Sequence, residues 1–314
     1  LAVYWGKLAA AVLVLAYGMH WAWRHLSVSR KSLDLGAMLD SWRYGMPLVA
    51  NEIAFIVLIS VDRVMLKHIT GDFEAVGIYT IVYSLAMQVN ILMQATLYEA
   101  FMPVANRVYA GEGDAGVRAL KRKVMLPIAY AAIAVAAMIL AIGNDAMLVL
   151  SGATKAASGP VFVIVGMTFA LYPLIDIGGY GLLLRKRSML VLGTTVAAAL
   201  ANILLNMLLI PRHGVMGAVI ATTISYLAMG VVRYRMCPAS LRCLPPLRPI
   251  LLACGCAALF LLAVGAFRAL GGLEPWSRLP LAGVLFLLLF VLPVWRLDPG
   301  LRQLLRLRHE ALAA

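Results

Sequence analysis

Long apolar runs alternate along the chain with short segments that carry charges, proline and glycine. A membrane-spanning helix needs about 20 mostly apolar residues. About nine runs reach that length, at residues 3–23, 44–66, 77–104, 124–143, 158–184, 189–210, 215–232, 249–267 and 279–295. Because irregular backbone cannot face lipid, we expect each run to be helical. The pattern therefore predicts an all-α, polytopic helical membrane protein with about nine transmembrane helices.

Composition indicates lipid rather than water as the surrounding solvent. The chain is 63% hydrophobic and 13% charged, with a mean hydropathy of +0.91. Soluble domains are about 45–50% apolar and about 25% charged. Too little polar surface remains to dissolve 314 residues, so the composition excludes an ordinary soluble protein.

The chain has a net charge of +13. The distribution of its basic residues indicates how the chain is oriented in the membrane and does not point to nucleic-acid binding. Most of the 27 Lys and Arg residues fall in alternate connecting segments, near 24–43, 107–123, 185–187, 233–248 and 296–308. The intervening segments hold only Lys67, Lys155, Arg212, Arg268 and Arg278. Positive residues accumulate on the cytoplasmic side of membranes. We expect a multi-pass protein of a bacterial inner (plasma) membrane with a cytoplasmic C-terminus and no nucleic-acid partner.

The four cysteines suggest no metal centre. Cys237 and Cys243 fall in a basic segment, and Cys254 and Cys256 lie inside an apolar run. No histidine is near them, and their spacing fits no usual zinc pattern. We expect all four to be reduced and structural.

Polar residues inside the second run form the clearest candidate site. A charge at the bilayer centre costs roughly 2.5–3.5 kcal/mol, so such residues need partners or water. Asn51 and Asp62 are 11 residues apart, as are Glu52 and Arg63, which is about three helical turns or 16 Å. We expect one polar stripe facing a wet cavity. Asp62 and Arg63 point about 100° apart, so each is expected to find a partner on another helix.

The third run carries Tyr83, Asn90 and Gln94 on one side and Glu99 on nearly the opposite side. Glu52 and Glu99 have similar predicted depths in antiparallel neighbours. If they meet, one would carry a proton. The alternative is that Glu99 reaches out to the membrane interface.

The fifth run combines a buried acid with helix-loosening residues. Tyr172 and Asp176 are one turn apart, Pro173 removes a backbone hydrogen bond, and glycines follow. A hinge beside the acid and a packed kink are both compatible with this pattern. The candidate substrate or ion pathway comprises Asn51, Glu52, Asp62, Arg63, Tyr83, Asn90, Gln94, Glu99, Tyr172 and Asp176. Asn202, Asn206 and Thr222 in later runs are interpreted as interhelical contacts.

Three loose motifs carry a family resemblance. They are Ser41-Trp-Arg-Tyr-Gly-Met-Pro-Leu-Val-Ala-Asn51, then Val61-Asp-Arg-Val-Met-Leu66 with Gly77-Ile-Tyr79, and Leu208-Leu-Ile-Pro-Arg-His-Gly-Val-Met-Gly-Ala-Val-Ile-Ala-Thr222. In this order and spacing the chain resembles the polysaccharide transporter branch of the multidrug/oligosaccharidyl-lipid/polysaccharide exporter superfamily, over most of residues 33–235.

The resemblance implies a domain plan. Residues 1–31 would be the last helix of a missing N-terminal lobe and a cytoplasmic linker, and residues 32–236 a six-helix C-terminal lobe. Residues 237–296 would form two accessory transmembrane helices, and 297–314 a basic cytoplasmic tail. The first run would then be the sixth of fourteen spans.

The resemblance also implies a function. Such transporters flip an oligosaccharide attached to undecaprenyl pyrophosphate from the cytoplasmic to the outer leaflet, for surface polysaccharides such as O-antigen or exopolysaccharide. Two lobes rock around a central cavity, with coupling to a proton or sodium gradient. The implied partners are the lipid bilayer, the lipid-linked oligosaccharide, the missing lobe, and polysaccharide polymerase or export proteins. The family's Asp-Arg pair corresponds to Asp62 and Arg63.

Two alternatives stay open at this point. One is an ion-coupled drug or metabolite antiporter of the same superfamily. The other is a membrane glycan polymerase, ligase or glycosyltransferase, which needs a hydrophilic loop or an acidic and basic cluster at one membrane face. The outer segments near 143–158 and 268–279 carry few charges. We therefore expect no enzyme, no catalytic residues, no metal and no cofactor.

Overall fold

The computed structural model describes residues 2–25, 34–95, 99–151, 158–269, 271 and 274–302. Every regular element within these ranges is helical and none is a strand, which confirms the all-α prediction. The chain divides into two compact units, residues 1–46 and 47–314. The first unit contains α1 (Ala2–His25) and the opening turns of α2.

Helix α2 (Leu35–Thr70) is one continuous element. Asp34 caps its start, since the carboxylate accepts hydrogen bonds from the backbone N–H of Gly36 at 2.9 Å and Ala37 at 3.3 Å. Helix α2 continues through Pro47. A proline removes a single helical hydrogen bond, and a helix this long retains the others.

A tight hairpin joins α2 to α3 (Phe73–Met93). Gly71 adopts a left-handed conformation with φ of +67°, which L side chains rarely adopt. Asp72 then caps α3 by accepting a hydrogen bond from the Glu74 N–H at 2.8 Å. Gly71 and Asp72 therefore reverse the chain direction between the end of α2 and the start of α3.

Glycines also break the two longest helices, α4 (Glu99–Ser151) and α6 (Ser188–Met236). Gly113 divides α4 with φ of +64°, and Gly214 divides α6 with φ of +54°. The two arms of α6 correspond to the sixth and seventh predicted spans. At Gly217 a Cβ atom would lie 2.4 Å from the Leu209 carbonyl oxygen, so the arms cross too closely for any side chain there. The glycines of the third motif therefore build this hairpin.

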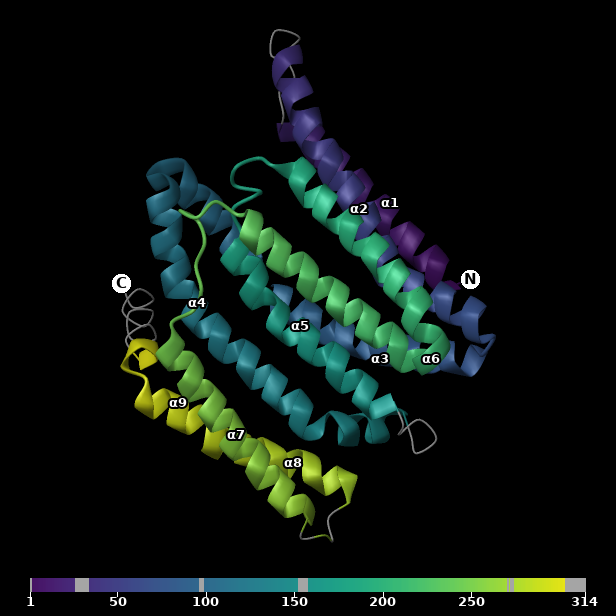
Figure 1. The fold of residues 1–314 in the computed structure, drawn as a ribbon. Helices are drawn as coiled ribbons and strands as arrows, with labels where there is room; N and C mark the ends of the chain where they lie inside the picture. Colours follow the sequence, from purple (N-terminus) through teal and green to yellow (C-terminus); the bar gives the residue numbers. More distant parts are fainter. Residues whose placement is uncertain are drawn as a thin grey trace. The chain divides into compact units, whose positions relative to one another are not determined.

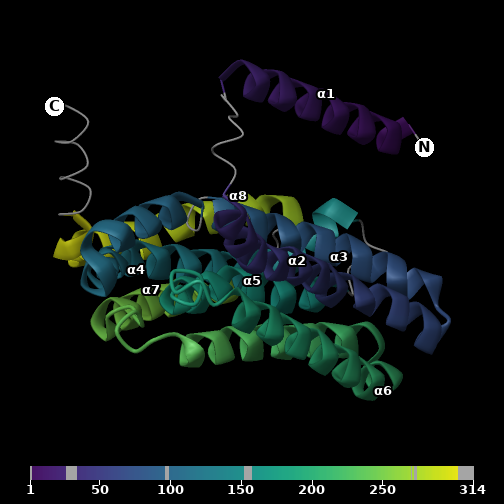
Figure 2. The same ribbon diagram turned by 90° about the horizontal axis from the view of Figure 1, so that it is seen from above.

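Helix α5 (Gly159–Gly179) is the central element of the second unit. It packs against α3, α4 and α6, and both views show α6 running alongside it (Figures 1 and 2). The predicted span to residue 184 is too long, because α5 ends at Gly179 and a turn follows. Near this end the backbone around Cys243 packs closely on the helix, since a Cβ atom at Gly178 would lie 2.7 Å from the Cys243 carbonyl oxygen.

The last two predicted spans are α7 (Leu247–Ala269) and a composite helix. The composite comprises α8 (Pro275–Phe286), a π-helical segment (Leu287–Val291) and α9 (Leu292–Leu297). Both pack on α4 (Figure 1). The Tyr130 hydroxyl donates a hydrogen bond to Asp298 Oδ2 at 2.7 Å, which joins α4 to the end of α9. The predicted basic tail beyond residue 302 lies outside the described residues.

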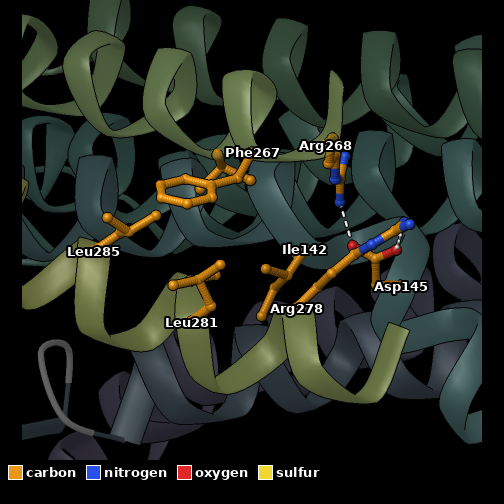
Figure 3. Close-up of a pocket in the computed structure, with 9 residues that line it drawn as sticks. Ile142, Asp145, Phe267, Arg268, Arg278, Leu281 and Leu285 are labelled. Carbon is orange, nitrogen blue, oxygen red and sulfur yellow. Dashed lines mark hydrogen bonds and ion pairs between the residues drawn. The ribbon is translucent and has the colours of Figure 1, made fainter. Parts of the chain in front are cut away.

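A charged cluster also joins α4 to α7 and α8. Figure 3 shows the Asp145 carboxylate of α4 between Arg268 of α7 and Arg278 of α8. Arg278 Nη1 lies 3.5 Å from Asp145 Oδ1, and Arg268 bonds the other carboxylate oxygen. Removing one partner of a buried ion pair is strongly destabilising, because it leaves an uncompensated charge. This cluster fastens the accessory helices to α4.

Seven helices of the described ranges are long and apolar enough to cross a membrane. They are α2, α3, α4, α5, α6, α7 and the composite of α8 and α9. Because α6 contains two arms and α1 (24 residues) precedes these helices, the architecture agrees with about nine predicted spans.

Candidate functional site

A hydrogen-bonded cluster surrounds Asp62, whose side chain is fully buried. Its Oδ2 accepts hydrogen bonds from the Tyr79 hydroxyl at 2.6 Å and the Thr222 hydroxyl at 2.5 Å. Its Oδ1 accepts one from Asn206 Nδ2 at 2.6 Å. Asn202 completes this Asp62 cluster by accepting from Asn206 at 3.0 Å and donating to Thr222 at 3.3 Å.

The Asp62 cluster brings together residues from three separate sequence motifs. Asp62 comes from the Asp-Arg pair on α2, Tyr79 from Gly-Ile-Tyr on α3, and Thr222 from the end of the glycine hairpin motif on α6. Sequence interpretation assigned Asn206 and Thr222 to interhelical contacts, and they do join helices. The predicted wet cavity is wrong for Asp62, because α3 and α6 enclose its carboxylate.

Among the described residues the Asp62 carboxylate has no basic partner, which is unusual for a buried acid. Its partners in the structure are neutral hydroxyl and amide donors, and none of the ion pairs among the described residues includes it. Buried charges are normally paired with an opposite charge, because desolvation is costly. In this cluster, hydrogen bonds from neutral donors on α3 and α6 compensate the carboxylate.

Arg63 points away from its neighbour, as the 100° offset predicted. Its guanidinium carbon lies 5.2 Å from the centroid of the Tyr83 ring on α3, a cation–π contact. Its Nε is buried without a hydrogen-bond partner. The prediction that Asp62 and Arg63 each find a partner on another helix is confirmed.

Aromatic rings extend from the Asp62 cluster into the core. Tyr79 and Tyr83 are 5.6 Å apart between ring centroids, and Tyr83 meets Phe169 edge-on at 5.7 Å. Phe169 contacts Tyr226 at 5.6 Å, and Tyr226 contacts Tyr172 at 5.7 Å. This row of rings starts on α3 and continues over α5 and α6 to Tyr172, one helical turn before Asp176.

A second polar cluster lies three turns back along α2, at Asn51. The Asn51 side-chain oxygen accepts a hydrogen bond from the Thr195 hydroxyl at 2.5 Å. Arg233 joins them by donating to Thr195 at 2.6 Å, Thr194 at 2.9 Å and the Val191 carbonyl at 3.2 Å. The two clusters confirm that Asn51 and Asp62 share a face, and that face packs on α6.

Asp176 is within electrostatic reach of two cations that the sequence analysis counted as loop charges. Arg233 and Lys121 are the basic groups acting on its carboxylate, and Tyr172 is its neighbour one turn earlier. Lys121 is fully buried; its Nζ donates to the Gly178 carbonyl at 2.9 Å and the Leu241 carbonyl at 2.7 Å. Together with the close approach at Gly178, these bonds favour the packed interpretation of α5 over the hinge.

The remaining predicted site residues lie outside the Asp62 and Asn51 clusters or at their edge. Asn90 is buried on α3, and its side-chain oxygen accepts a hydrogen bond from Gln94 at 3.4 Å. Glu52 is exposed and accepts from Asn51 Nδ2 at 3.4 Å. Glu99 begins α4 and is exposed. In the described part of the chain no hydrogen bond joins Glu52 to Glu99. The structure therefore does not show the contact between these two acids that the sequence allowed.

All four cysteines are free thiols, as expected. Among the described residues, no group of three or more His, Cys, Asp or Glu side chains is placed to hold a metal ion.

Comparison with known proteins supports the resemblance over part of the chain. A family model described as "Polysaccharide biosynthesis protein" matches residues 1–108. This segment includes Asp62, Arg63 and Tyr79, and the match is consistent with a polysaccharide transporter of the predicted superfamily. Searches of curated proteins and of solved structures give no significant match.

Proposed function

We propose that this chain is part of a flippase that moves an undecaprenyl-pyrophosphate-linked oligosaccharide from the cytoplasmic to the outer leaflet. The supporting observation is the Asp62 cluster, in which the family-matched segment supplies Asp62 and Tyr79 and a distant hairpin supplies Thr222. In this proposal the protein lies in a bacterial inner membrane with its C-terminus in the cytoplasm, and works with a second lobe by alternating access.

Asp62 is the proposed coupling site for a proton or a sodium ion. Its carboxylate accepts from α3 and from both arms of α6, so a bound cation would compete with donors on two other helices. A ligand shifts a conformational equilibrium only through its different affinity for the two states. Loss or gain of the cation would therefore change how α2 packs against α6.

Arg63 and the exposed polar residues of α2 are the proposed contacts for the substrate. A guanidinium forks onto two phosphate oxygens, which suits a pyrophosphate-linked glycan. Arg63 is only half-buried and its charge rests on the Tyr83 ring rather than on an acid. An arriving phosphate would thus meet a cation that has no carboxylate to displace.

The test is deletion of the full-length gene in the source organism, followed by complementation. Lipid-linked oligosaccharide is quantified in extracts, and surface glycan is measured alongside. Accumulation of intact lipid-linked repeat units with loss of surface glycan supports the flippase. Unchanged lipid-linked sugar together with altered tolerance to cationic drugs would overturn it and favour the antiporter.

A further inference from the structure

A basic pocket outside the Asp62 cluster opens beside the connection between α6 and α7. Its volume is about 510 Å³. The lining residues are Arg118, Arg122, Tyr234, Ala239, Arg242, Cys243, Leu244 and Pro246. Three of these are arginines and none is acidic, so the pocket concentrates positive charge.

Two segments of the chain bring the three arginines to one pocket. Arg118 and Arg122 are four residues apart on the second arm of α4, so they share one helix face. Arg242 is fixed from the opposite wall, where its Nε donates to the Cys237 carbonyl at 2.7 Å and another nitrogen bonds the Arg235 carbonyl. Backbone carbonyls position a guanidinium without cancelling its charge.

The acid closest to Arg118 in the sequence does not neutralise this group. Asp114 lies one turn before Arg118, but its carboxylate accepts from Arg185 at 2.6 Å and from the Ser240 hydroxyl at 2.5 Å. None of the ion pairs among the described residues includes Arg118, Arg122 or Arg242. Like charges that line one pocket repel one another, so a negatively charged occupant would be stabilising.

The position of the pocket indicates which kind of anion. Helix α6 ends at Met236 and α7 begins at Leu247, and both are candidate membrane spans, so the pocket lies where the chain leaves and re-enters lipid. Leu244 on the rim is 65% exposed and Leu247 beside it is 68% exposed. Apolar side chains at a charged rim suit a molecule with a phosphate head and acyl chains.

We propose that this pocket binds the phosphate headgroup of an anionic bilayer phospholipid. Basic pockets between spans at one membrane face recognise such headgroups through several Lys or Arg side chains. Arg118, Arg122 and Arg242 contact the phosphate, Tyr234 lines the headgroup, and the acyl chains lie along Leu244 and α7. The bound lipid joins α4 to the α6–α7 connection. This site is independent of the proposed substrate pathway.

The test uses native mass spectrometry of the full-length protein in non-ionic detergent. Phosphatidylglycerol and phosphatidylcholine with identical acyl chains are titrated as probes, each against inorganic phosphate and against undecaprenyl phosphate as competitors. We expect phosphatidylglycerol to be retained preferentially. The double variant R118Q/R122Q should weaken its binding about tenfold or more, since each arginine contributes about 1 kcal/mol near a membrane surface.

Two further variants separate the pocket from general charge. R107Q/K123Q removes the same charge from exposed positions of α4 outside the pocket and should retain phosphatidylglycerol. Ala239→Trp fills the pocket while keeping every arginine, and should lose the lipid. Equal retention by wild type and R118Q/R122Q would overturn the proposal. So would displacement by inorganic phosphate at equal concentration, or preferential binding of undecaprenyl phosphate, which would assign the pocket to a free anion or to the transport substrate.

Discussion

The hydroxyl of Thr222 donates a hydrogen bond of 2.5 Å to Oδ2 of Asp62, across 160 residues of sequence. This bond joins the second arm of α6 to the C-terminal part of α2 inside a fully buried site. Asp62 belongs to the Asp-Arg motif and Thr222 ends the third motif, so both were visible in the sequence. Their contact appears only in the fold. The relationship explains why each motif is placed where it is.

Removing the Thr222 hydroxyl should weaken the cluster. Thr222→Val keeps the side-chain volume but takes one donor from a buried carboxylate. Hydrogen bonds to charged groups contribute about 1.5–3 kcal/mol, so we expect a comparable loss in the free energy of unfolding and a strong fall in transport. Thr222→Ser retains the hydroxyl and is the matched control. Denaturant unfolding in detergent checks the first effect; equal stability of the two variants would contradict it.

Lys121 should be a stabilising buried lysine rather than a loop charge. Lys121→Met removes the donor from two carbonyls, those of Gly178 and Leu241. Leaving buried acceptors without a donor costs about 1–3 kcal/mol. Lys123→Met on the exposed surface of the same helix should change stability by no more than about 0.5 kcal/mol. Thermal unfolding of both variants decides, and a Lys121→Met protein as stable as wild type would refute the assignment.

The close crossing at Gly217 predicts intolerance of even one methyl group. Gly217→Ala would place Cβ 2.4 Å from a backbone oxygen, so the α6 hairpin must open. We expect little folded protein in the membrane. Gly193→Ala on the first arm has open space around it and should be neutral or stabilising by up to about 1 kcal/mol. Size-exclusion profiles of the two purified variants give the comparison, and matching monodisperse yields would argue against the crossing.

The thiols of Cys237 and Cys243 should react slowly in the folded protein. Burial raises the pKa of both thiols above their ordinary value. The thiolate is the reactive form, so below the raised pKa the folded protein holds less of it than the unfolded chain. Maleimide labelling at pH 8, resolved by peptide mass spectrometry, should be slow before unfolding and fast afterwards.

The same shift has a consequence for stability. Because the folded pKa is the higher one, the unfolded thiols ionise first as pH rises through about 8.5. Unfolding should therefore become more favourable in alkaline buffer, with no contribution from these thiols below about pH 7. Rapid labelling of the native protein at pH 8 would contradict the burial of these residues.

Much of the fold followed from apolar periodicity, because spanning helices must satisfy their own backbone hydrogen bonds. The angular offset of Asp62 and Arg63 also followed, since helical geometry fixes it locally. What the sequence does not determine is which helices meet. Asn206 and Thr222 were recognisable as polar residues in spans, but only tertiary packing brings them to Asp62.

The errors have similar physical causes. Arg233 and Lys121 were counted as cytoplasmic loop charges, because counting treats every basic residue near a span end alike. In the structure Lys121 is fully buried and Arg233 bonds Thr194 and Thr195. The wet cavity at Asp62 was expected because a polar stripe needs partners, and hydroxyl and amide groups of α3 and α6 supply them instead.

The most direct test of the account is the Asp62→Asn variant of the full-length protein, expressed in the deletion strain at wild-type membrane levels. The amide keeps the shape of the side chain and removes its charge. We expect surface glycan to fall about tenfold or more while lipid-linked oligosaccharide accumulates, with Glu74→Gln, an exposed acid of the same hairpin, restoring both to normal. Normal surface glycan with Asp62→Asn would contradict the central role assigned to this carboxylate.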